Sequence, residues 1–266
     1  TALHAFLVVT SFLMIVPFLW MISTALKGQS EIYVYPPTWL PEQLHLENFA
    51  RAWQTAPFGR FYLNSIIVTL IITFFQVLTS ALAAYVFARL NFPGRDLIFY
   101  LYVATLIIPL QVTMMPLYLI LNSLGWINTY QGLTVPFLAN AFTVFFLRQF
   151  FLTIPRELED AARVDGCGRL RFLGQIMIPL ARPALATIAL FVFLSHWDDY
   201  LWPLIVTNST DMRTLPIGLR YFVSESGSQF HYMMAAALMA EPAEAATSIS
   251  PPISAVMTTL VLTCIH

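Results

Sequence analysis

Apolar residues in this chain are gathered into long runs that short polar stretches separate. A membrane-spanning helix needs about 20 mostly apolar residues, each adding about 1.5 Å of length. Turn-forming residues mark the breaks, for example Pro36-Pro37 and Asn91-Phe92-Pro93-Gly94. Five runs are long enough to cross a bilayer, namely residues 3–26, 62–88, 97–121, 132–152 and 183–206. The pattern predicts an all-α, polytopic membrane protein, with residues 1–266 forming a single transmembrane domain.

The end of the chain departs from this pattern. Residues 232–239 begin like a sixth span, but glutamates and prolines follow before the last apolar stretch, residues 253–265. That stretch is too short to cross a bilayer, and a glutamate deep in the membrane costs several kcal/mol unless it is paired or protonated. We therefore expect an irregular sixth helix or an aberrant tail over residues 240–266. A changed reading frame or a sequence error near Ala240 is our hypothesis for the tail. Intact mass or resequencing of the gene tests it, and an unbroken apolar helix in the true gene product would support it.

Composition agrees with a membrane protein. The chain is 58% hydrophobic and 10% charged, against about 45–50% and about 25% in soluble domains. Its net charge of −1 offers no basic surface for nucleic acid. The first run exceeds a signal-peptide core of about 7–15 residues and ends without a small-residue cleavage site, so we expect it to be retained. The chain begins at Thr1 rather than at a methionine, so we expect a short segment ahead of it.

Arginines predict the orientation of the spans. The second connection carries Arg89 and Arg95. The fourth connection and the end of the run before it carry Arg148, Arg156, Arg163, Arg169, Arg171 and Arg182. Because basic residues favour the cytoplasmic side, these two connections and both termini are expected to be cytoplasmic. The only lysine is Lys27, and no Gly-x-x-x-x-Gly-Lys-Ser/Thr sequence surrounds it, so the chain lacks that type of phosphate-binding loop for ATP.

The fourth connection, about residues 153–182, also predicts a short surface helix. Its acids fall at the start of the helix, where the helix dipole favours negative charge, and Glu159 and Arg163 form a favourable i,i+4 pair. Gly166 supplies a left-handed stop. The helix is expected from Arg156 to Asp165, with Leu158, Ala161 and Ala162 on one face. It is either a docking element for a soluble partner or an amphipathic helix lying on lipid headgroups.

This connection resembles a known signature. Asp160-Ala161-Ala162, then Gly166, then Ile176, Ile178 and Pro179 follow the spacing of the Glu-Ala-Ala loop in the membrane subunits of bacterial ABC importers, with Asp for the usual Glu and Ile for the usual Leu. Other segments resemble the carbohydrate-uptake branch of that family, the maltose and glycerol-phosphate type. These are residues 61–65, 108–113, 197–204 and 215–219. The resemblance covers about residues 3–239, and the later tail departs from it.

The resemblance implies a type I ABC importer permease fold, with six transmembrane helices in a bacterial inner membrane. It further implies a second permease subunit, an extracytoplasmic solute-binding protein, and an ATPase dimer that receives the loop as a coupling helix. ATP and Mg²⁺ would be held by the ATPase, so this chain would bind no cofactor and catalyse no reaction. In the family the acidic residue bonds to the ATPase, so Asp160 would take that role, helped by Glu159. The implied coupling residues are Glu159, Asp160, Ala161, Ala162, Gly166, Ile176 and Pro179.

Polar residues inside the runs are candidates for a solute pathway, because such groups usually face a bundle interior or a cavity. The candidates are Asn64, Gln111, Thr113, Trp197, Asp198, Asp199 and Tyr200. Each amide or hydroxyl could instead join two helices, a contact worth about 1 kcal/mol. The cluster at residues 197–200 could equally cap the outer interface. Metal binding there is not expected, because His196 has no further His or Cys at ligand spacing, and Cys167 and Cys264 predict no disulfide.

Two functions are compatible with these features. The first is a permease subunit of an ATP-driven importer that moves a sugar or sugar-like solute into the cytoplasm by alternating access. The alternative is an ion-coupled secondary transporter of a small polar solute that uses Asp198 and Asp199 as proton or cation sites. The signature loop favours the first.

Overall fold

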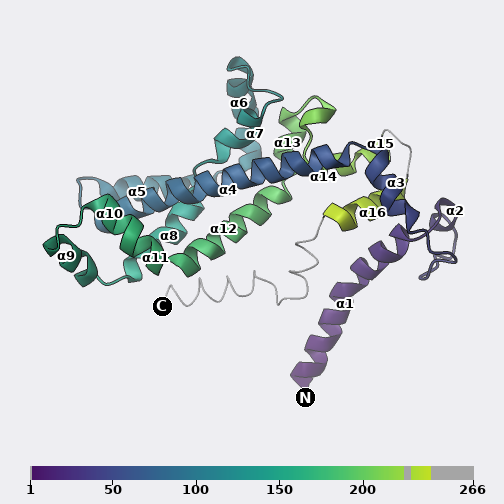
Figure 1. Ribbon diagram of the computed structural model, residues 1–266, viewed down its shortest axis with the longest axis horizontal. Helices are drawn as coiled ribbons and strands as arrows, with labels where there is room; N and C mark the ends of the chain where they lie inside the picture. The colour runs from purple at the N-terminus through teal and green to yellow at the C-terminus, as the bar shows by residue number, and fades with distance from the viewer. Residues whose placement is uncertain (1, 225–228, 241–266) are drawn as a thin grey trace. The chain divides into compact units, whose positions relative to one another are not determined.

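The computed structural model describes residues 2–224 and 229–240, and every regular element in these ranges is helical (Figure 1). The all-α prediction is therefore confirmed for the described residues. The predicted aberrant tail and its proposed frame change lie outside them, apart from Ala240. The longer helices are α1 (Ala2–Ala25), α3 (Glu47–Thr55), α4 (Phe58–Arg89), α5 (Arg95–Ala104), α6 (Leu110–Ser123), α8 (Ala141–Thr153), α9 (Glu157–Val164), α12 (Arg182–Trp197) and α16 (Phe230–Ala240).

Shorter helices link these elements. They are α2 (Gln29–Ile32), α7 (Tyr130–Thr134), α10 (Arg169–Phe172), α11 (Ile178–Leu180), α13 (Leu201–Val206), α14 (Leu215–Leu219) and α15 (Tyr221–Ser224). Three 3₁₀ turns, η1 (Thr105–Ile107), η2 (Val135–Phe137) and η4 (Thr210–Met212), and one π-helical turn, η3 (Leu173–Met177), complete the described part. The described part of the chain divides into two compact units, the residues up to 62 together with those from 214 onward, and residues 63–213. The signature loop belongs to the second unit.

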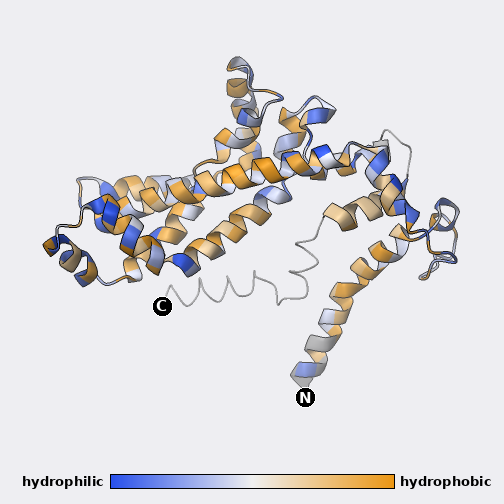
Figure 2. Ribbon diagram, viewed as in Figure 1, coloured by the Kyte–Doolittle hydropathy of each residue, from blue (hydrophilic) through white to orange (hydrophobic). Residues whose placement is uncertain are grey.

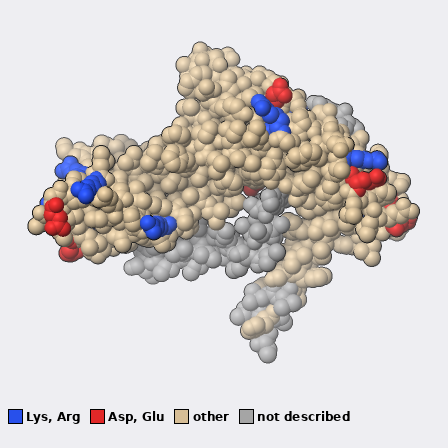
Figure 3. Space-filling model, viewed as in Figure 1, with Lys and Arg blue, Asp and Glu red and all other residues tan. Residues whose placement is uncertain are grey.

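Among the described residues, α4 alone is long and apolar enough to cross a membrane without a break. Its 32 residues correspond to about 48 Å at a rise of about 1.5 Å per residue. Figure 2 shows α4 largely in the colour of apolar residues, whereas α9 and α10 carry hydrophilic positions. Few charged side chains interrupt the surface drawn in Figure 3, as the low charged fraction requires.

Three of the runs expected to span the membrane are bent or interrupted in the structure. The run 97–121 turns by 100° between η1 and α6, because Pro109 follows Ile108 and a residue before proline is forced into extended backbone. The run 132–152 bends by 41° where Asn140 accepts hydrogen bonds from the first amides of α8. The run 183–206 stops at Trp197 and resumes at Leu201.

The number of spans depends on how these bends are counted. Within residues 2–224 and 229–240, up to four spans result if each bent pair is one span, and Val9–Ala25 and Phe230–Ala240 are shorter apolar helices. The paired segments are 95–107 with 110–123, 130–137 with 141–153, and 169–180 with 182–197. The six-helix count therefore stays a prediction.

The core of the second unit is an apolar cluster to which α4, α8 and α12 contribute. Ile72, Leu147, Ile188 and Trp202 are all nearly or fully buried in it. The Trp202 indole donates to the carbonyl of Gly132 at 3.0 Å. That bond ties α13 to α7, so the short helix after the break at Trp197 is held by the same unit.

The first unit packs α1 and α3 against α16. It also joins two segments that resemble the carbohydrate branch. Gly218 in α14 lies so close to Phe61 that a Cβ there would come within 2.2 Å of the ring. Glycine is therefore required at this position by the close approach of an aromatic ring.

Candidate functional site

A short helix lies where the sequence predicts one in the fourth connection. It is α9, Glu157–Val164, one residue shorter at each end than expected. Three acids fall in its first turn, which suits the positive end of the helix dipole. Gly166 follows with φ +76°, a left-handed backbone that favours glycine, and its amide donates to the Arg163 carbonyl at 3.0 Å.

The two faces of α9 have different surroundings. Glu159 and Ala162 are 7% and 6% exposed, three residues apart and thus on one inward face. Asp160 and Ala161 are exposed, and Leu158 is 41% exposed. The predicted grouping of Leu158, Ala161 and Ala162 follows from their helical spacing, but the three are not equally accessible: Ala162 is buried, while Leu158 and Ala161 remain at the surface.

The inward face of α9 carries a charge cluster. Glu159 Oε1 accepts a hydrogen bond from Arg163 at 2.7 Å, and Glu159 Oε2 lies 4.0 Å from the Arg89 guanidinium. Arg89 also donates to the carbonyls of Phe151 at 2.8 Å and Ile154 at 2.6 Å. Burial of the Arg89 and Glu159 charges is tolerated because each is paired and hydrogen-bonded.

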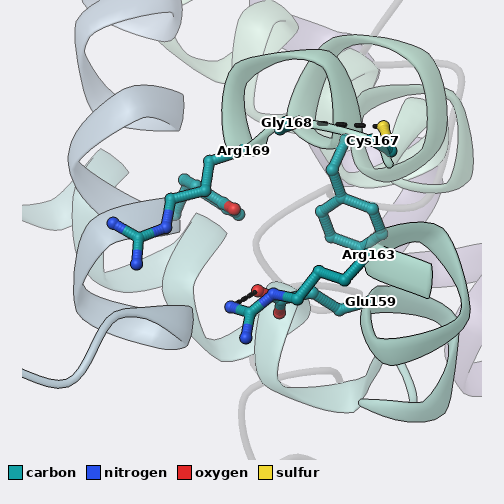
Figure 4. Close-up of a pocket in the computed structure, with 7 residues that line it drawn as sticks. Glu159, Arg163, Cys167, Gly168 and Arg169 are labelled. Carbon is teal, nitrogen blue, oxygen red and sulfur yellow. Dashed lines mark hydrogen bonds and ion pairs between the residues drawn. The ribbon is translucent and has the colours of Figure 1, made fainter. Parts of the chain in front are cut away.

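Beside this cluster lies a hollow of about 330 Å³. Figure 4 shows Glu159 and Arg163 joined across one side of it, with Cys167, Gly168 and Arg169 around the rest. The remaining lining residues are Tyr85 and Phe172. The hollow is open at the surface of the loop, which gives this region a concave, charged face.

The later residues of the signature lie within an irregular helix. Ile176 lies in the π turn η3 and Pro179 in α11, both partly buried. Proline cannot donate to the carbonyl four residues earlier and its ring crowds that carbonyl, so a widened turn just before Pro179 relieves the clash. Met177 between them is fully buried. The loop thus returns to the core before the chain enters α12.

Asn64 is placed by three hydrogen bonds within the second unit. Its amide nitrogen donates to the carbonyls of Asp211 at 2.8 Å and Arg213 at 2.9 Å, and its oxygen accepts from the Tyr130 hydroxyl at 2.6 Å. The side chain is fully buried. These bonds are those of a group that joins structural elements, and binding a solute through Asn64 would require breaking them.

The other pathway candidates fall at helix breaks. Gln111 and Thr113 are exposed in the first turn of α6, directly after the 100° bend. Trp197 is buried at the end of α12 and its ring stacks on Phe193, with centroids 5.6 Å apart. The exposed Asp198 follows.

Asp199 and Tyr200 connect Asp198 to the next helix, α13. Asp199 accepts a long hydrogen bond, 3.4 Å, from the Trp202 amide at the start of α13. Tyr200 is half-buried and precedes Leu201, the first residue of that helix. Across the described ranges, no group of three or more His, Cys, Asp or Glu side chains is placed to hold a metal ion.

The contacts of Arg89 were missed by reading the sequence. In the sequence analysis, Arg89 contributes only as a positive charge that predicts the orientation of the spans in the membrane. Its acceptors are main-chain carbonyls 62 and 65 residues further along the chain. Such acceptors exist at every residue, so no side-chain pattern marks them.

Comparison with known proteins adds a second line of evidence. The family model described as binding-protein-dependent transport system inner membrane component matches residues 76–265. The diacetylchitobiose uptake system permease protein NgcG of Streptomyces coelicolor is 38% identical over 231 residues, which cover 86% of this chain and 76% of that protein. The sn-glycerol-3-phosphate transport system permease protein UgpE of Yersinia enterocolitica is 32% identical over 262 residues, or 96% of this chain and 90% of that protein.

A solved structure shares the fold. It belongs to a bacterial ABC transporter involved in the import of the acidic polysaccharide alginate. The match has a TM-score of 0.81 at 21% identity and covers 98% of this chain and 94% of that one.

Proposed function

This chain belongs to the family of binding-protein-dependent transport system inner membrane components, and we propose on that premise that it moves a sugar or sugar-like solute into the cytoplasm. The chain is a permease subunit of an ABC importer. An ion-coupled secondary transporter is not favoured, because the matching relatives are permease proteins of uptake and transport systems.

The proposed solute is an uncharged saccharide. One relative is named for diacetylchitobiose uptake and another for sn-glycerol 3-phosphate transport. The expected spans lack the Lys or Arg cluster that a phosphate ester would need as a counter-charge, which favours the first chemistry. Half-buried Tyr200 is the candidate ring for stacking on a sugar face, since Trp197 is buried against Phe193, and the exposed Gln111 and Thr113 are candidate hydrogen-bonding groups.

The exposed carboxylate of Asp160 carries the proposed coupling mechanism. It projects from α9 at the spacing of the signature, while Glu159 beside it is buried. A separate ATPase dimer, holding ATP and Mg²⁺, receives this loop on the cytoplasmic side. Closure of the dimer displaces α9 and opens the solute pathway outward. A second permease subunit completes the pathway, and an extracytoplasmic binding protein delivers the solute.

Transport by purified complexes in lipid vesicles tests this proposal. The permease is assembled with its companion permease, ATPase and binding protein, and uptake of labelled diacetylchitobiose is measured with and without ATP. We expect Asp160→Lys and Gly166→Pro to reduce ATP-driven uptake and solute-stimulated ATP hydrolysis at least tenfold, because each alters the docking loop. Unlabelled sn-glycerol 3-phosphate serves as a competitor for the alternative solute chemistry.

Charge reversal at Glu42 is the matched control. Glu42 is exposed in the first unit, outside the signature loop, and Glu42→Lys should retain the ATPase during purification as the unaltered chain does. Normal ATP-driven uptake in both loop variants would refute the proposed coupling. Uptake that needs an ion gradient and no ATPase would support the secondary-transporter alternative.

A further inference from the structure

Arg89 ends α4 and reaches across to the end of α8. Its side chain is only 2% exposed. It donates at 2.8 Å and 2.6 Å to the carbonyls of Phe151 and Ile154, in the last turn of α8 and at the residue that caps it. The last carbonyls of a helix have no partner within the helix and carry its negative dipole end. A buried guanidinium donates hydrogen bonds to these carbonyls and places a positive charge at the negative end of the dipole. Arg89 therefore fastens the end of α8 to the end of α4.

The same guanidinium also faces α9. One of its nitrogens lies 4.0 Å from Glu159 Oε2, and the Glu159 side chain is 9% exposed. Removing either charge would leave the other buried with reduced compensation, which is strongly unfavourable. Arg163 completes the cluster from the solvent side, with its side chain 53% exposed. Arg89 is therefore the inner of the two cations that hold Glu159.

The inward position of Glu159 determines where Asp160 points. Consecutive residues of an α-helix project about 100° apart around its axis. With Glu159 fixed toward Arg89, Asp160 is turned out of the cluster and is exposed. Rotation of α9 about its axis would bring Glu159 out of its ion pair. The pair thus sets the face that α9 presents.

We propose that Arg89 is a positioning residue for energy coupling, acting through Glu159 and the carbonyls of Phe151 and Ile154. It ties α9 to the ends of α4 and α8, so that displacement of α9 is passed to both helices. This inference rests on the proposed function, because it concerns how the ATPase contact at Asp160 reaches the membrane. Arg89 and Glu159 do not themselves touch the ATPase in this account.

A merely structural role makes a different prediction. If the cluster only stabilises the fold, its loss lowers the amount of assembled transporter but leaves each assembled complex equally effective. If the cluster transmits motion, complexes still form and hydrolyse ATP, but solute no longer controls hydrolysis. The informative quantity is therefore solute transported per ATP hydrolysed, normalised to assembled complex.

The test compares three variants in the reconstituted transporter with diacetylchitobiose as the probe. Glu159→Gln keeps the size of the side chain and an acceptor for Arg163 but removes the charge that faces Arg89. Arg89→Lys keeps the charge but replaces a planar fork with a compact ammonium that cannot both donate to the two carbonyls and face the Glu159 carboxylate as the guanidinium does. Arg163→Met is the matched control, because it removes the exposed partner of the same glutamate and leaves the Arg89 contacts intact.

We expect Glu159→Gln and Arg89→Lys to assemble with the ATPase and keep its basal hydrolysis, while the transport-to-hydrolysis ratio falls about tenfold. Arg163→Met should stay within about twofold of the unaltered chain. An unchanged ratio in assembled Glu159→Gln overturns the inference, even if less complex forms. If Arg89→Lys fails to assemble, Glu159→Gln alone decides.

The unaltered complex separates this inference from the proposed function. If it shows no ATP-driven uptake and no stimulation by the loaded binding protein, the proposed function fails. If Asp160→Lys abolishes coupling while Glu159→Gln behaves as the unaltered chain does, only the role of Arg89 fails.

Discussion

Two buried cations, Lys27 in the first unit and Arg89 in the second, hold polar segments in different ways. Lys27 is 2% exposed, donates to the Thr38 carbonyl, and lies 4.7 Å from the centre of the Trp20 ring. Its contacts lie within 11 residues along the chain. Arg89 binds groups at least 62 residues away and faces a carboxylate. Lys27 fixes one loop locally, whereas Arg89 links three helices.

The groups around each cation explain why one position holds a lysine and the other an arginine. Lys27 meets one carbonyl and an aromatic face, which a compact ammonium satisfies through a hydrogen bond and a cation–π contact. Arg89 meets two carbonyls and a carboxylate in different directions, which suits a planar guanidinium with several donors. The comparison predicts large, long-range effects at Arg89 and smaller, local effects at Lys27.

The largest expected effect is that of Arg89→Met. The variant leaves Glu159 buried with only Arg163 as partner and removes donors from two carbonyls, so we expect a loss of ~3–5 kcal/mol. Thermal unfolding in detergent, followed by loss of the monodisperse peak in size-exclusion chromatography, measures this. A melting temperature equal to that of the unaltered chain would contradict the link between α4, α8 and α9.

Asn48→Ala is expected to have the next largest effect, confined to the first unit. The buried Asn48 amide donates to the carbonyls of Ala25 at 2.8 Å and Lys27 at 2.9 Å, so its removal leaves two buried acceptors at a cost of ~1–3 kcal/mol. Limited proteolysis should detect faster cleavage within residues 26–48. Equal acceleration within residues 153–182 would show that the effect is not local.

Lys27→Met removes the cation but keeps an apolar stem against Trp20. The lost hydrogen bond and cation–π contact predict a cost of ~1–2 kcal/mol. Co-purification of the ATPase should be unchanged, because the contacts of Lys27 lie in the first unit. If Lys27→Met retained less ATPase than Arg89→Met does, the conclusion that Lys27 acts locally and Arg89 over a longer range would be contradicted.

Arg163→Met should have the smallest effect. Its pair with Glu159 is an i,i+4 contact with one half-exposed partner, and such pairs contribute less than ~1 kcal/mol. Raising the salt concentration should weaken it in the unaltered chain but not in the variant. A loss comparable to that in Arg89→Met would show that Arg163, rather than Arg89, is the main partner of Glu159.

The contrast between local contacts and contacts distant along the chain also explains which features of the fold and the site could be predicted from the sequence. Long apolar runs predict helices, and the acids followed by Gly166 predict α9 to within one residue at each end. Periodicity alone could not orient α9, because acids and small residues occur on both of its faces. The assignment of Glu159 beside Asp160 as a coupling residue likewise could not reveal that Glu159 turns inward.

Hydropathy also missed the helix breaks. The apolar count treats Ile108-Pro109 and residues 198–200 as parts of continuous spans, but proline geometry and the side chain of Asp199 divide them. The contacts of Asn64 were missed for the same reason as those of Arg89, since its donor groups reach main-chain carbonyls about 150 residues away.

Photo-crosslinking from residue 160 tests the central claim most directly. A benzophenone maleimide is attached to Asp160→Cys in a Cys167→Ser, Cys264→Ser background, and the assembled transporter is illuminated. We predict a covalent product with the ATPase subunit, and none from a probe at Glu42→Cys. A transporter that imports diacetylchitobiose with ATP but gives no ATPase product from residue 160 would contradict the docking of this loop on the ATPase.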